Sequence, residues 1–85
     1  MERIIEYSKI NILRLVQRAR FMGLIHSPEE AEYPEFIHSL WSTFLSSHEL
    51  GEEARRVDYM LGRGDSIQLL SDVLIDASLL EFKIY

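Results

Sequence analysis

Apolar residues recur with the 3.6-residue period of the α-helix in four segments of the chain, and short glycine, proline or serine signals separate these segments. The first segment covers residues 4–22 and is followed by Gly23, a residue type that favours the left-handed turn after a helix. The pattern predicts a helix that buries one stripe against the rest of the domain. The side chains expected to face the core are Ile4, Ile5, Ile12, Leu15, Val16, Ala19 and Met22.

Two prolines define the second segment. Residues 27–30 read Ser-Pro-Glu-Glu, which is typical of a helix start because a serine cap precedes proline and acidic residues. Pro34 disfavours the α conformation at Tyr33, so we expect a short turn over 28–32 and a new helix over 34–45. The apolar residues of this helix are Phe36, Ile37, Leu40, Trp41, Phe44 and Leu45.

Capping residues and glycines set the bounds of the last two helices. Ser46 or Ser47 is expected to cap the third helix, residues 62–64 (Gly-Arg-Gly) to end it, and Asp65 to cap the fourth. The alternation of apolar and polar residues over 80–85 fits either a continued helix or a short strand. The expected core stripes are Leu50, Ala54, Val57 and Leu61 in the third helix, and Ile67, Leu70, Val73, Leu74, Ala77 and Leu80 in the fourth.

Together these segments predict an all-α fold, a single domain over residues 1–85 built as a small bundle of about four antiparallel helices. A chain of 85 residues buries only about two thirds of its unfolded surface, so a second subunit would stabilise it. The alternatives are that segment 28–32 and Met60 cover the last helix, or that a helical hairpin completes its core only as a dimer. Four apolar residues outside the core stripe of the last helix are the expected homodimer interface: Leu69, Ile75, Leu79 and Phe82.

The sequence patterns for catalysis and metal binding are incomplete. The chain has no cysteine, and its four glycines lie at expected helix ends rather than in a phosphate-binding loop. Glu35 and His38 have the spacing of carboxylate-bridged di-iron helices, but no second Glu-x-x-His occurs. Residues 63–65 match the Arg-Gly-Asp triplet of integrin ligands, although helix termini explain the same residues. We therefore expect a non-enzymatic protein without a metal or a cofactor.

Charge is distributed unevenly along the chain. The net charge is −5, with five basic and two acidic residues in 1–22, and four basic and twelve acidic residues in 23–85. The overall acidity argues against nucleic acid and anionic membranes as partners. No apolar run has the length of a membrane span or of a signal peptide. Together with the lack of cysteine, this predicts a cytoplasmic location.

Two surfaces are candidates for binding another protein. One lies on the first helix opposite its core stripe, where arginine alternates with large apolar residues, a composition found at binding hot spots. Its residues are Arg3, Tyr7, Ile10, Arg14, Arg18 and Phe21. The alternative is that Ile10 and Phe21 pack on another helix. The second surface is acidic and, with segment 49–58, would complement a basic site such as that of a nuclease. Its residues are Glu29, Glu30, Glu32 and Glu35.

The function that fits these features is a protein-binding regulator or inhibitor that covers a surface of its partner. Small acidic helical proteins without catalytic sites include bacterial and phage immunity proteins, antitoxins and anti-defence proteins, which is an analogy of class only. One alternative is a nucleic-acid-binding regulator, with segments 48–61 and 66–80 as a helix-turn-helix, although Asp72 and Asp76 would repel phosphate. The other alternative is a dimeric structural or adaptor module that uses the edge of the last helix.

Overall fold

Four α-helices and one short 3-10 helix make up the domain in the computed structural model, which describes residues 2–26 and 28–77. This confirms the predicted all-α class and the number of helices. Residues 80–85, predicted as helix or strand, and the side chain of Ala77 lie outside the described part. The elements are α1 (Glu2–Phe21), η1 (Pro28–Glu32), α2 (Pro34–Ser46), α3 (Gly51–Leu61) and α4 (Arg63–Ala77).

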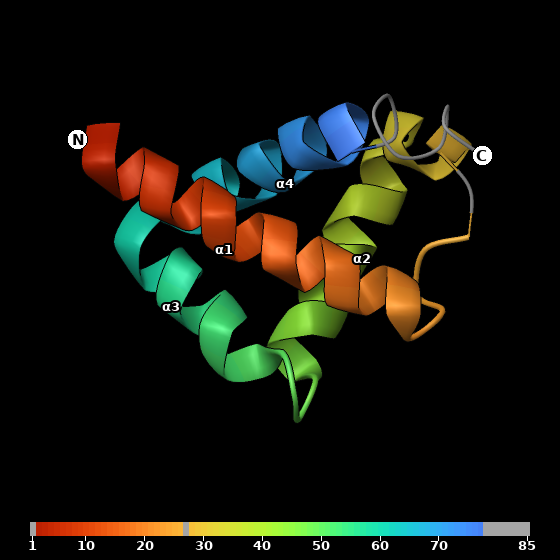
Figure 1. Cartoon of the computed structure of the whole chain (residues 1–85), viewed down its shortest axis with the longest axis horizontal. Helices are drawn as coiled ribbons and strands as arrows, with labels where there is room; N and C mark the ends of the chain where they lie inside the picture. Colours follow the sequence, from red (N-terminus) through yellow and green to blue (C-terminus); the bar gives the residue numbers. More distant parts are fainter. Residues whose placement is uncertain (1, 27, 78–85) are drawn as a thin grey trace.

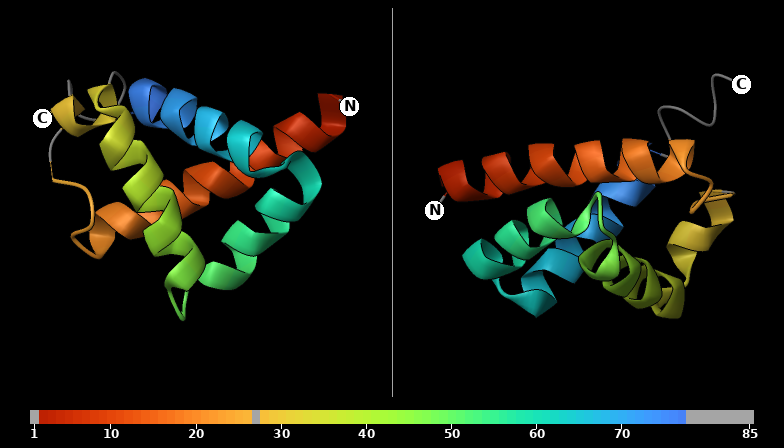
Figure 2. Two further views of the ribbon diagram at one scale, coloured as in Figure 1. Left: turned by 180° about the vertical axis from the view of Figure 1, so that it is seen from behind. Right: turned by 90° about the horizontal axis from the view of Figure 1, so that it is seen from below.

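The helices form two layers. In Figure 1, α2, α3 and α4 lie along the three sides of a triangle, and α1 crosses over it. The right view of Figure 2 shows α1 as a separate layer above the other three helices. The arrangement therefore differs from a set of antiparallel neighbours, because tight connections turn the chain at the corners of the triangle. Since α1 packs on α3 and α4 with one face, its opposite face points away from the other helices of the described part of the chain.

The core lies between the two layers. Trp41 and Phe44 of α2 are completely buried, and their rings meet edge to face with centroids 5.9 Å apart. The predicted stripes of α2 and α3 are confirmed in or against the core: Phe36, Leu45 and Leu61 are half-buried and the other members are buried. The buried apolar residues are Ile12, Leu15, Val16, Ala19, Ile25, Ile37, Leu40, Trp41, Phe44, Leu50, Ala54, Val57, Leu70, Val73 and Leu74.

Several predicted helix ends are confirmed by their hydrogen bonds. Tyr33 is extended, with φ −103° and ψ 112°, as the following proline requires. The Oγ of Ser47, one of the two predicted caps, accepts the backbone N–H of Leu50 at 3.1 Å just before α3. Gly23 has φ +82°, and the next residue donates its N–H to the carbonyl of Ala19 at 2.9 Å, which closes α1.

The connection between α3 and α4 corrects one prediction. Gly62 alone joins the two helices, with φ +88°, and α4 begins at Arg63. The carbonyl of Gly62 accepts the N–H of Ser66 at 2.9 Å, which is the first hydrogen bond of α4. Asp65 therefore lies within the first turn instead of capping the helix. A carboxylate there still interacts favourably with the helix dipole.

The two ends of α1 correct another prediction. Ile4 and Ile5 are 42% and 47% exposed, and Met22 is exposed to a similar extent, although all three were expected in the core. For Ile4 and Ile5 the reason is the length of α1, whose first turn extends to the edge of the layer below (Figure 1), whereas Met22 lies in the turn that follows α1. Among the described residues, none of the helices has the length and hydrophobicity needed to cross a bilayer.

Candidate functional site

The exposed face of α1 carries the six residues predicted as a binding surface, which we call the outer stripe: Arg3, Tyr7, Ile10, Arg14, Arg18 and Phe21. All six side chains are exposed. Phe21 is 95% exposed and Ile10 is 54% exposed, so neither packs into an interface with another of the helices that the structure describes. The cause is geometric, because Ile12 and Leu15 direct the opposite face of α1 onto α3 and α4. The stripe spans about 27 Å at a rise of about 1.5 Å per residue.

The arginines of the outer stripe are largely free to bind another molecule. Arg18 lies 3.9 Å from the carboxylate of Glu49, but the two side chains are 49% and 63% exposed, so this ion pair contributes little. Arg3 and Arg14 form no ion pair with any described residue. Each guanidinium offers a planar set of donors that matches a carboxylate.

The acidic residues predicted as the second surface lie on η1 and at the start of α2. Glu30 is half-buried and accepts the backbone N–H of His26 at 2.6 Å, so it holds the loop after α1. Glu29 is exposed and also interacts within the chain. Glu32 and Glu35 are exposed, and Glu35 lies in the first turn of α2, where a carboxylate is favourable. Part of this surface therefore has a local structural role.

The predicted dimer edge is divided by the structure. Leu69 is half-buried and faces the first turn of α1, while Ile75 is 45% exposed and lines a different depression beside Ile37 of α2. Leu79 and Phe82 lie outside the described residues. The two described members therefore do not form one continuous surface, and the homodimer stays a prediction.

Asp58 of α3 is a structural residue that the sequence prediction did not single out. Its carboxylate accepts the indole N–H of Trp41 at 2.9 Å and the Nε–H of Arg63 at 2.6 Å. It thereby joins α2, α3 and α4. The same contact holds the arginine of the Arg-Gly-Asp triplet, which begins α4 and forms no extended loop. A buried indole N–H needs an acceptor, and this requirement is the feature of the sequence that could have predicted a polar partner for Trp41.

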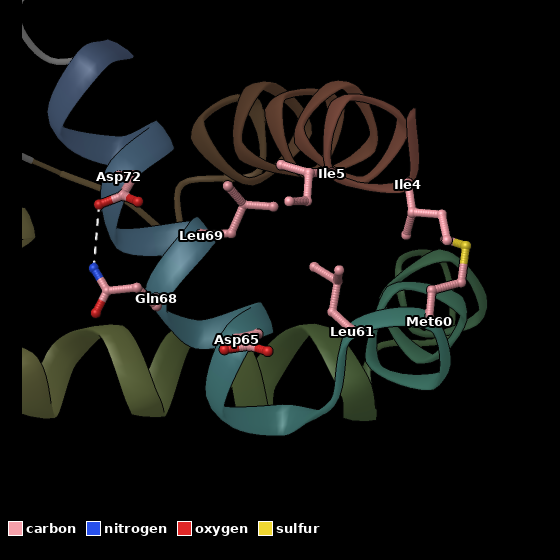
Figure 3. A pocket seen from close by; sticks show the side chains of 8 residues that line it. All are labelled: Ile4, Ile5, Met60, Leu61, Asp65, Gln68, Leu69 and Asp72. Atoms are coloured by element: carbon pink, nitrogen blue, oxygen red, sulfur yellow. Dashed lines mark hydrogen bonds between the residues drawn. The ribbon is translucent and has the colours of Figure 1, made fainter. Parts of the chain in front are cut away.

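A second feature absent from the sequence prediction is a cleft at the start of α4, with a volume of about 340 Å³ (Figure 3). Apolar side chains from α1, α3 and α4 point into it, and polar side chains of α4 form one side. The Gln68 amide donates to Asp72 at 3.2 Å along this side. The lining residues are Ile4, Ile5, Met60, Leu61, Asp65, Gln68, Leu69 and Asp72. The cleft was not predicted because Ile4 and Ile5 were both assigned to the core.

No group of three or more His, Asp or Glu side chains among the described residues is arranged to hold a metal ion. Glu35 and His38, the pair with di-iron spacing, are both exposed on α2. Comparison of the chain with protein-family models, curated proteins and solved structures finds no match. The surfaces themselves therefore carry the functional argument.

Proposed function

We propose that this protein is a non-enzymatic, protein-binding regulator that acts by covering a surface of its partner, and that the outer stripe of α1 makes the contact. The observation that carries the proposal is the 95% exposure of Phe21 on a helix that also presents Ile10, Tyr7 and three arginines on the same side. Aromatic residues and arginine are the types that contribute most to binding energy at protein interfaces.

The energetics favour a protein partner for this stripe. Transfer of a large apolar side chain such as Phe21 from water into an interface contributes about 1.5–3 kcal/mol. The helix is already ordered by its packing on α3 and α4, so binding requires little further loss of backbone entropy. A single exposed helix face of this kind fits the groove of another protein, in the mode used for helical peptides.

The charge distribution indicates an acidic partner. Residues 1–22 carry +3 and residues 23–85 carry −8, so an acidic surface is attracted to α1 and repelled by the rest of the domain. This asymmetry orients the encounter and raises its rate at low salt. The matching partner has an apolar groove bordered by aspartate or glutamate.

The experiment compares two aromatic side chains that are exposed to nearly the same extent. Phe21→Ser changes the outer stripe, and Tyr59→Ser is the matched control, since Tyr59 is 92% exposed on α3. Affinity capture from lysate of the source cells, with nuclease added, is read by mass spectrometry. We expect a stoichiometric protein that the native chain and Tyr59→Ser retain and Phe21→Ser loses.

Other outcomes of this capture contradict the proposal. Retention of the same protein by both variants would exclude the outer stripe as the contact. Partners that disappear after nuclease treatment would identify a nucleic-acid-binding protein instead. A partner lost only with the double variant Glu32→Gln/Glu35→Gln would assign recognition to the acidic residues of η1 and α2.

A further inference from the structure

The cleft between the first turn of α1 and the start of α4 combines an apolar floor with one acidic side. Figure 3 shows the side chains of Leu69 and Ile5 pointing toward each other, Ile4 beside Met60, and Leu61 pointing into the same space from the end of α3. Two carboxylates, Asp65 and Asp72, line the same cleft, and none of the described residues that line it is basic. A flexible methionine in the lining lets such a floor adapt to different apolar side chains.

No described residue neutralises the negative charge of this cleft. Asp65 and Asp72 are exposed and form no ion pair with any described residue. Asp72 accepts a hydrogen bond from the uncharged amide of Gln68, which leaves its charge in place. Arg63, the nearest basic residue in sequence, is held by Asp58 at 2.6 Å. An occupant with a positive charge would therefore pair with two carboxylates that have no ion-pair partner among the described residues.

The form of the cleft indicates that the occupant is part of a larger molecule. Sites for small ligands enclose most of the ligand surface. Here two of the walls, Ile4 and Ile5, remain 42% and 47% exposed, so the cleft is an open trough. A trough of about 340 Å³ holds one or two side chains that a protein presents from outside.

We propose that this cleft binds an amphipathic basic helix of a partner protein. Asp65 and Asp72 are seven residues apart on α4, which places them two turns and about 10.5 Å apart along one side of the helix. A partner helix with lysine or arginine at positions i and i+7 has the same spacing between its charges. Leucines at i+3 and i+4 of that helix lie between the charges and reach the apolar floor.

This site is separate from the outer stripe and does not rest on the proposed function. The cleft uses Ile4 and Ile5 at the side of α1, whereas the outer stripe uses Phe21 and its neighbours. The two sites also have opposite charge, so they select different partners. Phe21→Ser leaves the cleft intact, and variants of Asp65 or Asp72 leave the outer stripe intact, so each proposal can fail alone.

The test uses a designed peptide as the probe. An alanine-based helix of about 18 residues, long enough to be partly helical in water, carries arginine at i and i+7 and leucine at i+3 and i+4. The control peptide has the same composition with its leucines moved to i+2 and i+5, on the opposite face. Binding is measured by calorimetry, and its location by NMR shifts of methyl groups.

We expect the first peptide to bind more tightly than the control and to shift the methyl signals of Ile4, Ile5 and Met60. Asp65→Asn and Asp72→Asn should each weaken binding by about two- to fivefold, the usual effect of one exposed ion pair. Asp76→Asn is the matched control, because Asp76 is exposed on α4 but does not line the cleft. It should leave binding unchanged.

Three results would overturn the proposal. One is equal affinity for the two peptides, which would show attraction by charge alone. Another is an equal loss of binding with Asp76→Asn and Asp72→Asn, which would show a diffuse acidic surface instead of a site. The third is methyl shifts that are absent from Ile4, Ile5 and Met60.

Discussion

The hydrogen bond between Trp41 and Asp58 is expected to contribute more to stability than the shorter contact between Asp58 and Arg63. Trp41 is completely buried, so removal of the Asp58 carboxylate leaves its indole N–H without an acceptor. The Arg63 side chain is 60% exposed, and water replaces its partner readily. The Asp58 side chain, 15% exposed, is the residue common to both contacts.

The magnitude follows from these two environments. An unsatisfied buried N–H costs about 1–3 kcal/mol, and an exposed ion pair contributes about 0.2–1 kcal/mol. Alanine is a better helix former than aspartate, which offsets about 0.5 kcal/mol in α3. Asp58→Ala should therefore lower the free energy of unfolding by about 2 kcal/mol. Arg63→Ala should lower it by less than about 1 kcal/mol.

The assay is urea unfolding followed by the fluorescence of Trp41, the single tryptophan of the chain, with circular dichroism as a second probe. In a domain of this size a loss of about 2 kcal/mol lowers Tm by about 8–16 °C. Asp58→Asn is a second control, since an amide oxygen still accepts the indole N–H, and it should cost less than Asp58→Ala. Equal small losses for Asp58→Ala and Arg63→Ala would refute the reasoning, because the indole bond would then contribute nothing.

Three further predictions concern helix packing, a turn and assembly. Ser8 is completely buried on α1, and its Oγ has no hydrogen-bond partner among the described residues, so Ser8→Ala should raise the free energy of unfolding by about 1 kcal/mol in urea titrations. A loss of stability would show that the hydroxyl has a partner. Gly62→Ala should lower the free energy of unfolding by about 1–2 kcal/mol because φ at this position is +88°. No atom lies within 4 Å of the added Cβ, so a steric clash would not explain the loss, and an unchanged Tm would contradict this conformational origin. Sedimentation velocity at high micromolar concentration should give a homodimer that Ile75→Ser weakens, and a monomer throughout would contradict the predicted dimer.

Local signals along the chain predicted most of the fold. The helix from Pro34, the turn over 28–32, the cap at Ser47 and the end of α1 at Gly23 each depend on interactions within a few residues. Such features are visible in sequence because their partners are close in the chain. The start of α4 was misplaced for a related reason. Asp65 is a good capping residue, but the conformation of Gly62 opens the helix earlier.

The functional surfaces were harder to predict because they depend on how many sides of a helix are covered. Periodicity placed Ile12 in the core stripe of α1 and Ile10 opposite it, but it left open the difference between an exposed Ile10 and one that packs on another helix. That difference arises only when α1 is placed across α3 and α4. The cleft has the same origin, since Ile5 and Leu69 come from opposite ends of the chain.

A long helix that covers one side of a small layer presents a surface that three packed helices cannot bury. Chains of this size bury a limited fraction of their surface. An apolar residue that stays exposed is harmful mainly when it promotes non-specific association. On α1 three arginines accompany the exposed Phe21, Ile10 and Tyr7, and their like charges oppose contact between two copies of this face. The same charges attract an acidic surface. The charges that oppose self-association through the outer stripe therefore also favour the partner that we propose for it.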